Sequence, residues 1–162
     1  MIVLGVDAPN GWAVVDRDRM LTSGRWAKGK GFTALSVDIA LAVDEAIFRG
    51  AQVLASEGQF SEWRDSVEAK AKAGINRSAL LTAKHTGMWI QEWSRQSGGL
   101  PVVEKQPAEW RRPVLGRGAP KDSRGLKRAA IEAVRMLYGV EVTTDEADAI
   151  CIARCVSFEA LG

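Results

Sequence analysis

Short apolar runs alternate with longer amphipathic stretches along the chain, and this alternation predicts an α/β fold. Near the N-terminus, apolar runs at 2–8 and 12–16 are separated by turn residues, and a third strand-like stretch follows from 20 to about 27. Runs of this length with short connections predict an antiparallel meander of three strands. From 33 to 49 the apolar residues repeat at helical spacing instead, which predicts a helix after the meander.

The rest of the chain alternates strands and helices. Its pattern predicts strands at 52–57 and 101–106, helices at 77–95, 121–138 and 144–158, and a loop with at most one helical turn at 107–120. A strand followed by a helix and a further strand favours parallel pairing with a right-handed crossover. We therefore expect one α/β domain over 1–162, with a mixed five-stranded sheet of three antiparallel strands and then two parallel ones, flanked by helices.

Composition fits a globular domain. Of the 162 residues 46% are hydrophobic and 26% are charged, which supplies a core and argues against a disordered or fibrous chain. We find no apolar run of membrane-spanning length and no basic segment ahead of the first apolar run, so we expect no membrane partner and no signal peptide. Cys151 and Cys155 have no further cysteine to pair with, which favours a reducing, cytoplasmic setting. With His85 as the single histidine, any metal must be bound by oxygen.

Charge is unevenly distributed although the chain as a whole carries only +2. The segment 105–135 contains nine basic and three acidic side chains, a net +6 that leaves −4 for the rest of the chain. A basic segment of this kind is typical of a polyanion-binding surface. Taken alone, it is equally typical of a solvated loop followed by a charged helix face.

Four carboxylates occupy the ends of predicted elements. Asp7 ends the first strand, Glu57 ends the fourth, and Asp145 and Asp148 lie three residues apart near the start of the last helix. If the first and fourth strands are neighbours, Asp7 and Glu57 emerge at the same edge of the sheet, where ligands of open α/β sheets bind. Thr143 begins a predicted capping box, so Asp145 taken singly is explained by the helix dipole.

Carboxylates at such an edge require a counter-charge. One pair 4 Å apart repels by about 4 kcal/mol at an effective dielectric constant of 20. No lysine, arginine or histidine lies beside these acids in the sequence to neutralise them. Mg²⁺ and Mn²⁺ prefer oxygen ligands, and two such ions can assist phosphodiester hydrolysis. The sequence therefore predicts a divalent-metal site.

The acidic motifs resemble those of a known family. LGVDAPNGWAVV, LASEGQF and TDEADAICIA are similar to the four acidic motifs of the RuvC-type Holliday-junction resolvases, within the RNase H-like nuclease superfamily. RSALLTAKHTG resembles that family's third-helix segment, and LPVVEKQPAEWRRPVLGRGAPKD its fifth strand and basic loop, so the resemblance covers nearly the whole chain. Two positions differ: the usual D-P-G reads D-A-P-N-G from Asp7, and Gly58 stands where a glutamine is common.

The resemblance implies a DNA endonuclease that cuts four-way junctions symmetrically and leaves 5′-phosphate and 3′-hydroxyl ends. It implies two Mg²⁺ per subunit, with Mn²⁺ as a substitute, and branched DNA as the partner. Asp7 would bridge the two ions, and Glu57, Asp145 and Asp148 would complete their ligand shells. It also implies a homodimer, since two cuts related by a two-fold axis need two subunits. In the family, the helix that here carries Trp89 and Trp93 contributes to the dimer contact.

The resemblance also assigns residues to DNA. Phe60 would stack on a base at the junction, although core packing is its ordinary alternative. Arg111 and Lys121 would flank the active site, and Lys121 is a candidate catalytic residue beside the scissile phosphate. Further basic residues would contact the DNA backbone, unless they are merely solvent-exposed: Arg64, Lys70, Lys72, Arg77, Arg112, Arg117, Arg124, Lys127 and Arg128. Trp89, Trp93 and the two cysteines are expected in the core, and His85 on a helix surface or interface.

Three other functions are compatible with parts of this pattern. Another RNase H-like nuclease, acting on flaps, other branched DNA or RNA/DNA hybrids, would use the same carboxylates. A catalytically silent junction-binding module requires a lost carboxylate, and all four are present. An ATP-binding domain of the actin and sugar-kinase kind needs a glycine-rich hairpin and a second such domain, for which 162 residues leave no room.

Overall fold

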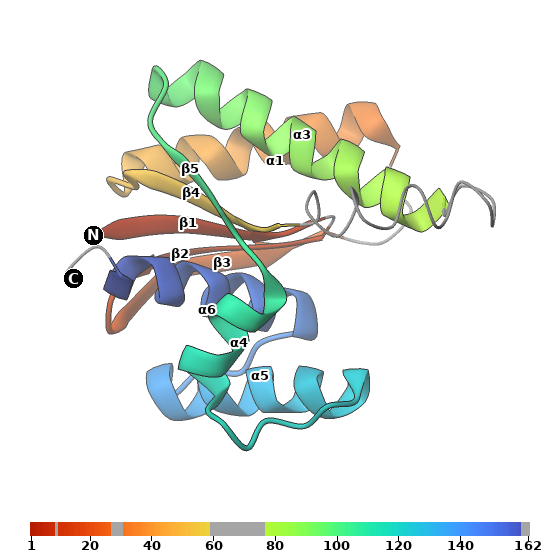
Figure 1. Ribbon diagram of the computed structural model, residues 1–162. Helices are drawn as coiled ribbons and strands as arrows, with labels where there is room; N and C mark the ends of the chain where they lie inside the picture. The colour runs from red at the N-terminus through yellow and green to blue at the C-terminus, as the bar shows by residue number, and fades with distance from the viewer. Residues whose placement is uncertain (9, 27–30, 59–76, 160–162) are drawn as a thin grey trace.

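The computed structural model describes residues 1–8, 10–26, 31–58 and 77–159. Its sheet has five strands in the order β3-β2-β1-β4-β5 (Figure 1). The strand bounds are β1 Ile2–Asp7, β2 Gly11–Asp16, β3 Arg19–Arg25, β4 Val53–Glu57 and β5 Val102–Lys105. The first three strands pair antiparallel, and β4 pairs parallel with both β1 and β5. The predicted mixed sheet is confirmed.

Strand register places the ends of β1 and β4 side by side. Asp7 pairs with Gly11 across the hairpin to β2, and Val6 is opposite Ser56 in the parallel pair with β4. Glu57 therefore ends β4 at the same edge of the sheet where Asp7 ends β1. On the other side of β4, Glu57 pairs in register with Lys105 of β5.

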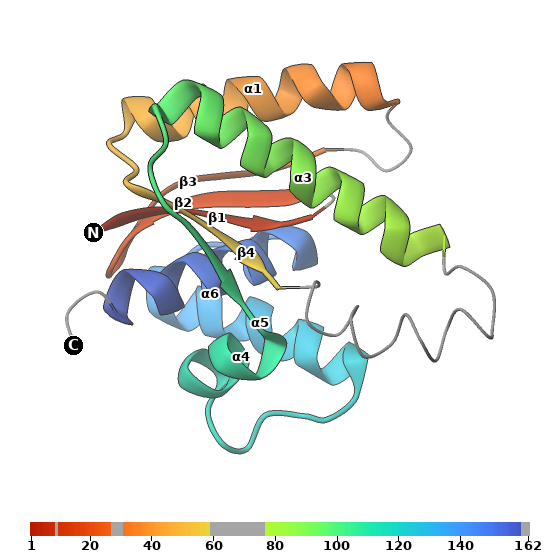
Figure 2. The same cartoon turned by 45° about the horizontal axis from the view of Figure 1, so that its top comes forward.

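Helices cover both faces of the sheet. In the described part of the chain they are α1 Phe32–Phe48, α3 Arg77–Ser97, α4 Pro107–Leu115, α5 Ser123–Tyr138 and α6 Thr144–Glu159. Figure 1 shows α1 and α3 over one face, α6 against the other, and α5 beyond α6. The turned view shows α4 close to the ends of β4 and β5 (Figure 2). None of the described helices is both long and apolar enough to cross a membrane.

Two glycines allow α6 to lie unusually close to the sheet. A Cβ at Gly5 would lie 2.2 Å from the Ala149 carbonyl oxygen, and one at Gly11 only 2.0 Å from the Asp145 carbonyl oxygen. Such distances leave no space for any side chain, so the backbone of α6 rests directly on β1 and β2. Because Gly11 pairs with Asp7, this contact brings the first turn of α6 to the end of β1.

The start of α6 is fixed by the predicted capping box. Thr143 donates from its backbone N–H and its Oγ1 hydroxyl to Glu146 Oε2, at 3.0 and 2.7 Å. Glu146 Oε1 also accepts a hydrogen bond of 3.0 Å from the Ser23 hydroxyl of β3. The capping residue thus ties α6 to the sheet next to Asp145.

Residues 107–115 form a helix where the sequence predicted mainly a loop, so that prediction is wrong. The helix α4 has nine residues and begins with a capping box between Gln106 and Glu109. Pro113 lies inside it and cannot donate to the carbonyl four residues earlier, that of Glu109. The Cys155 thiol donates to this same carbonyl oxygen at 3.7 Å. The same thiol lies 3.6 Å from Glu159 Oε1, and its single proton serves one acceptor at a time, so α6 supplies only a weak, shared substitute for the hydrogen bond that the proline removes.

Core predictions for single side chains have mixed outcomes. Trp89 and Trp93 are fully buried, and both cysteines are buried and free, as predicted. His85 is only 8% exposed and its ring lies 5.5 Å from that of Phe32, so the helix-surface alternative is wrong, while the interface alternative stays a prediction. Helical spacing did not reveal that α1 also covers this part of α3.

We predict that Gly11→Ala lowers the free energy of unfolding by about 1–3 kcal/mol, because the new methyl group forces α6 away from β2. Chemical denaturation measures this change. Gly87→Ala is the matched control: it lies in α3 with nothing within 4 Å of the added Cβ. It should be neutral or stabilise by up to about 1 kcal/mol. Equal effects of the two substitutions would contradict the close packing of α6.

Candidate functional site

The four predicted carboxylates come to one edge of the sheet. Asp7 and Glu57 end the adjacent strands β1 and β4, and Asp145 and Asp148 lie in the first two turns of α6. All four are partly buried. The register and the close approach of α6 at Gly11 bring them together, because neither element could shift without a clash.

Burial and mutual repulsion act strongly on two of these acids. The pKa of Asp7 is raised to about 8, mainly by burial and then by the negative charges of Asp148, Glu57 and Asp145. The pKa of Asp148 is raised to about 6, mainly by burial and then by the charge of Glu57. The positive charge of Lys127 opposes both shifts. The site therefore holds more negative charge than the protein alone neutralises.

This donor set fits a hard divalent cation in chemistry, but the side chains are not gathered as ligands. Among the described residues, no three aspartate, glutamate, histidine or cysteine side chains lie close enough to form a metal-binding group. One reason is that Glu57 is engaged elsewhere, with two residues of α4. Binding of a cation would have to draw Glu57 away from them. Because the pKa values of Asp7 and Asp148 are raised, a cation would also have to displace their protons, which makes its binding stronger at higher pH.

Trp110 and Arg111 hold the carboxylate of Glu57. The buried Trp110 donates from Nε1 to Glu57 Oε1 at 3.2 Å, and Arg111 donates from Nη2 to the same oxygen at 3.3 Å. The guanidinium of Arg111 lies 5.1 Å from the centre of the Trp110 ring, so the two side chains also support each other. Glu57 is thereby oriented and partly neutralised.

Sequence reasoning found no cation adjoining these acids, and the structure shows that cations reach them from other elements. Arg111 is 54 positions from Glu57 in the sequence, and Lys127 comes from α5. The signal that could have revealed Arg111 is the capping pattern at Gln106 and Glu109, which marks a helix and places Trp110 and Arg111 in its first turns. The proline at 113 concealed that pattern.

A basic pocket adjoins Asp148. It has a volume of about 200 Å³ and is lined by Trp110, Arg111, Lys121, Ser123, Leu126, Lys127 and Asp148. Lys121, predicted to be catalytic, therefore lies with Lys127 on the same pocket as one of the carboxylates. Such a pocket offers cations to an anionic oxygen placed beside the acids.

The other predicted DNA contacts divide into two groups. One group is exposed on α4, on α5 or on the connection between them: Arg112, Arg117, Arg124, Lys127 and Arg128. In the sequence they lie close to the residues that line the basic pocket, and their side chains are exposed to solvent. Phe60, Arg64, Lys70 and Lys72 lie outside the described residues, as does the side chain of Arg77 at the start of α3.

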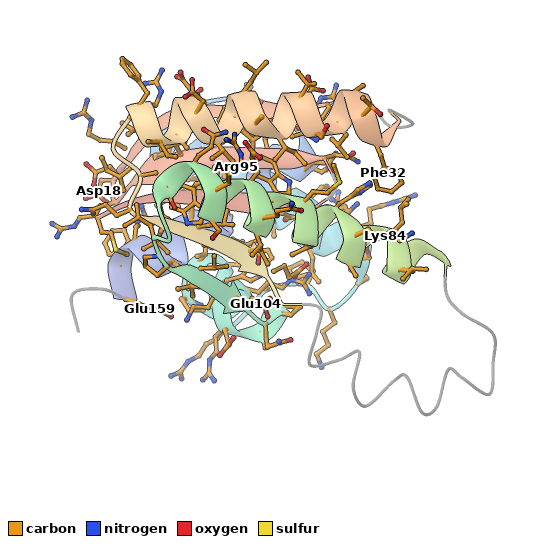
Figure 3. The ribbon with its side chains drawn as sticks, turned by 90° about the horizontal axis from the view of Figure 1, so that it is seen from above. Asp18, Phe32, Lys84, Arg95, Glu104 and Glu159 are labelled. Atoms are coloured by element: carbon orange, nitrogen blue, oxygen red, sulfur yellow. The ribbon has the colours of Figure 1, made fainter. Side chains whose placement is uncertain are left out.

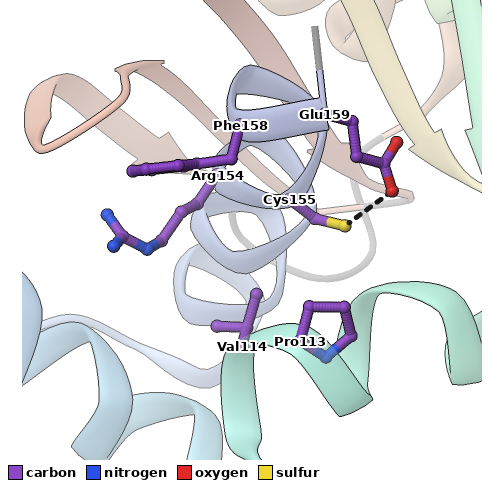
Figure 4. Close-up of a pocket in the computed structure, with 6 residues that line it drawn as sticks. All are labelled: Pro113, Val114, Arg154, Cys155, Phe158 and Glu159. Carbon is purple, nitrogen blue, oxygen red and sulfur yellow. Dashed lines mark hydrogen bonds between the residues drawn. The ribbon is translucent and has the colours of Figure 1, made fainter. Parts of the chain in front are cut away.

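A separate pocket lies toward the other end of α6 (Figure 4). It has a volume of about 380 Å³ and is lined by Pro113, Val114, Arg154, Cys155, Phe158 and Glu159. The Arg154 guanidinium lies over the Phe158 ring at 4.5 Å, and the Cys155 thiol contacts Glu159 at 3.6 Å. None of the four carboxylates lines it, so it is not part of the candidate site.

The architecture is the RuvC-like, RNase H-like α/β fold. The chain is similar to the structure of Thermus thermophilus RuvC, with a TM-score of 0.67 and 21% identity over 99% of this chain and 96% of that one. It is also similar to T. thermophilus RuvC in complex with a Holliday junction substrate, with a TM-score of 0.66 and 19% identity over 100% of this chain and 96% of that one. No family model and no curated protein matches the chain. At this level of identity, the likeness establishes the fold.

We predict that Asp7→Asn stabilises the protein at high pH when divalent cations are absent. A carboxyl group whose pKa is raised from 3.8 to about 8 by folding favours the folded state fully only below pH 3.8, and this advantage is lost as the pH rises through 8. Asparagine cannot ionise, so its advantage over wild type should grow between pH 5 and pH 9.

Thermal unfolding in EDTA measures this difference, which we expect to reach at least about 3 °C at pH 9. Asp44→Asn, on the exposed side of α1, is the control and should show no such dependence on pH. A difference between Asp7→Asn and wild type that is the same at pH 5 and pH 9 would contradict the raised pKa.

We also predict that Arg111→Gln tightens Mg²⁺ binding by roughly tenfold, or about 1.4 kcal/mol. Removing the guanidinium deletes the positive charge that competes for Glu57 and leaves that carboxylate available. Isothermal titration calorimetry without DNA measures the affinity. Arg112→Gln removes the same charge from an exposed neighbouring position and should change it less than twofold. Weaker Mg²⁺ binding in Arg111→Gln would show that the arginine supports the cation site instead of competing with it.

Proposed function

We propose that the chain is a structure-selective DNA endonuclease that resolves four-way junctions by divalent-metal-dependent hydrolysis of phosphodiester bonds. The observation that carries this proposal is the set of four carboxylates at the ends of β1, β4 and the start of α6, next to a pocket with two lysines. The shared fold with a RuvC structure that holds a Holliday junction substrate supports the choice of DNA.

The carboxylates have the role of holding cations. Asp7, Glu57, Asp145 and Asp148 would bind two Mg²⁺ ions per subunit, with Mn²⁺ as a substitute. When bound, these ions would promote attack by water on phosphorus and stabilise the leaving 3′ oxygen. The products would carry 5′-phosphate and 3′-hydroxyl ends.

The basic pocket has the role of placing the scissile phosphate. Lys121 and Lys127 line it together with Asp148, so a phosphate there would lie between cationic side chains and the carboxylate edge. If Glu57 held a cation, Arg111 would lose its present partner and would be available to a phosphate oxygen. The same arginine would then neutralise Glu57 in the free protein and the phosphate in the DNA complex.

The surface of α4 and α5 has the role of binding the DNA backbone. Its exposed arginines and lysines account for most of the +6 net charge of segment 105–135. Contacts of this kind are independent of sequence and make the affinity fall as the salt concentration rises. They suit an enzyme that recognises the shape of a branch.

We further propose that the protein acts as a homodimer, because a symmetric junction needs two cuts related by a two-fold axis. Trp89 and Trp93 are fully buried and cannot form the contact themselves. The neighbouring exposed residues of α1 and α3, including Phe32 and Lys84 with 6.0 Å between the ammonium and the ring centre, supply a face for it (Figure 3).

We predict symmetric nicks when a labelled four-way junction is incubated with the protein in Mg²⁺. Asp7→Asn should lower the cleavage rate by at least about 10³-fold, because it removes a ligand charge needed at the reacting phosphate. Its junction affinity, measured in Ca²⁺ or EDTA, should remain within about threefold of wild type. Asp44→Asn should cut like wild type.

Flap, duplex and RNA/DNA hybrid substrates form the comparison series in the same assay. Faster cleavage of a flap or a hybrid than of the junction would replace this function by another RNase H-like nuclease activity. Undiminished cleavage by Asp7→Asn would remove the carboxylates from the mechanism.

A further inference from the structure

A larger pocket lies on the other side of Arg111, and we call it the arginine pocket. It has a volume of about 430 Å³ and is lined by Ala108, Arg111, Arg112, Gly116, Arg117, Ala119, Pro120 and Leu126. Arg111 and Leu126 also line the basic pocket beside Asp148, so the two pockets share a wall. Whatever occupies the arginine pocket is therefore adjacent to whatever lies beside the carboxylates.

The lining of the arginine pocket combines two kinds of chemistry. Three arginines contribute guanidinium groups, and no acidic residue lines it. A guanidinium binds phosphate through paired hydrogen bonds and stacks on planar rings. Leu126 and Pro120 add apolar surface, which suits a nucleobase better than a hydrated phosphate. The volume lies in the range of small-ligand pockets, roughly 300–1,000 Å³.

The pocket wall is fixed by backbone contacts. Gly116, with φ of 83°, ends α4 and donates from its N–H to the Arg112 carbonyl at 3.1 Å. Asp122 caps α5 by accepting from the Gly125 N–H at 2.8 Å. A Cβ at Gly125 would lie 2.5 Å from the Pro120 Cβ, so Pro120 is pressed directly against the start of α5. The pocket is thus preformed by the connection between the helices.

One donor at the shared wall has no partner. The Nε of Arg111 is buried and makes no hydrogen bond in the described part of the structure. A buried donor left unsatisfied is unfavourable. A shift of the Arg111 guanidinium on ligand binding would expose this donor to a phosphate oxygen of a strand running from one pocket to the other.

We propose that the arginine pocket binds one unstacked nucleotide of the cleaved strand, next to the nucleotide whose phosphate lies beside Asp148. Arg112 and Arg117 bind its phosphate, and Leu126 and Pro120 contact its base. Seating this nucleotide fixes the position of the neighbouring scissile phosphate, which is the positioning that such hydrolysis depends on. The identity of the strand rests on the proposed function, whereas the binding of a nucleotide does not.

Binding can be tested without cleavage. ¹⁵N-labelled protein in EDTA is titrated separately with the dinucleotide pTpT, with inorganic phosphate and with thymidine, and NMR shifts are recorded. We expect pTpT to bind at least tenfold more tightly than either small probe, with the largest shifts at the backbone amides of Gly116, Arg117 and Ala119. Equal affinity for phosphate and pTpT, or shifts confined to other segments, would overturn the proposal.

Matched double variants separate the pocket from general charge. Arg112→Gln with Arg117→Gln should weaken pTpT binding at least tenfold, whereas Arg19→Gln with Arg49→Gln removes the same charge away from α4 and α5 and should leave it within twofold. Leu126→Ala should weaken pTpT and leave phosphate unchanged, with thermal unfolding confirming that it folds. Equal losses in the two double variants would reduce the pocket to bulk electrostatics and refute it. Because no cleavage is measured, a failed junction assay would not affect this result.

Discussion

The contact between α6 and the sheet is the constraint on which the rest of the structure depends. Glycines at 5 and 11 let the backbone of α6 lie against β1 and β2, and any side chain there would collide with it. Asp145 and Asp148 therefore cannot move independently of Asp7. This arrangement fixes the positions of the carboxylates relative to one another. It also disfavours their ionised forms, as the raised pKa of Asp7 shows.

This electrostatic cost is partly offset from outside the sheet, through α4. Trp110 and Arg111 hold Glu57. Lys127 of α5 opposes the rise that burial and repulsion cause in the pKa values of Asp7 and Asp148, and Arg111 also opposes it at Asp148. The same short region thus balances the acids and carries the basic surface. A ligand that brings its own cations and phosphates can exchange partners with these side chains without leaving a charge uncompensated.

The positions of most strands and helices could be predicted from the sequence, because apolar periodicity shows which face of an element is buried. The pairing of β1 with β4 could be predicted from the rule for parallel crossovers. The carboxylate edge followed from the same reasoning, since Asp7 and Glu57 end adjacent strands. The helix α4 did not, because Pro113 is a strong helix breaker in isolation and its compensation by Cys155 is a tertiary contact 46 positions away. The family resemblance placed Arg111 beside the active site, but its hydrogen bond to Glu57 was not predicted, and neither was the approach of Lys127 to the acids, since both residues are distant from these acids in the sequence.

The contact between Cys155 and the carbonyl freed by Pro113 also has a consequence for how this chain can change over generations. A proline at 113 is tolerable while position 155 offers a donor, and a donor at 155 is useful while position 113 is a proline. We therefore expect residues at 113 and 155 to vary together among related chains. Such covariation would reflect hydrogen bonding within the fold, since neither residue lines the pocket beside the carboxylates.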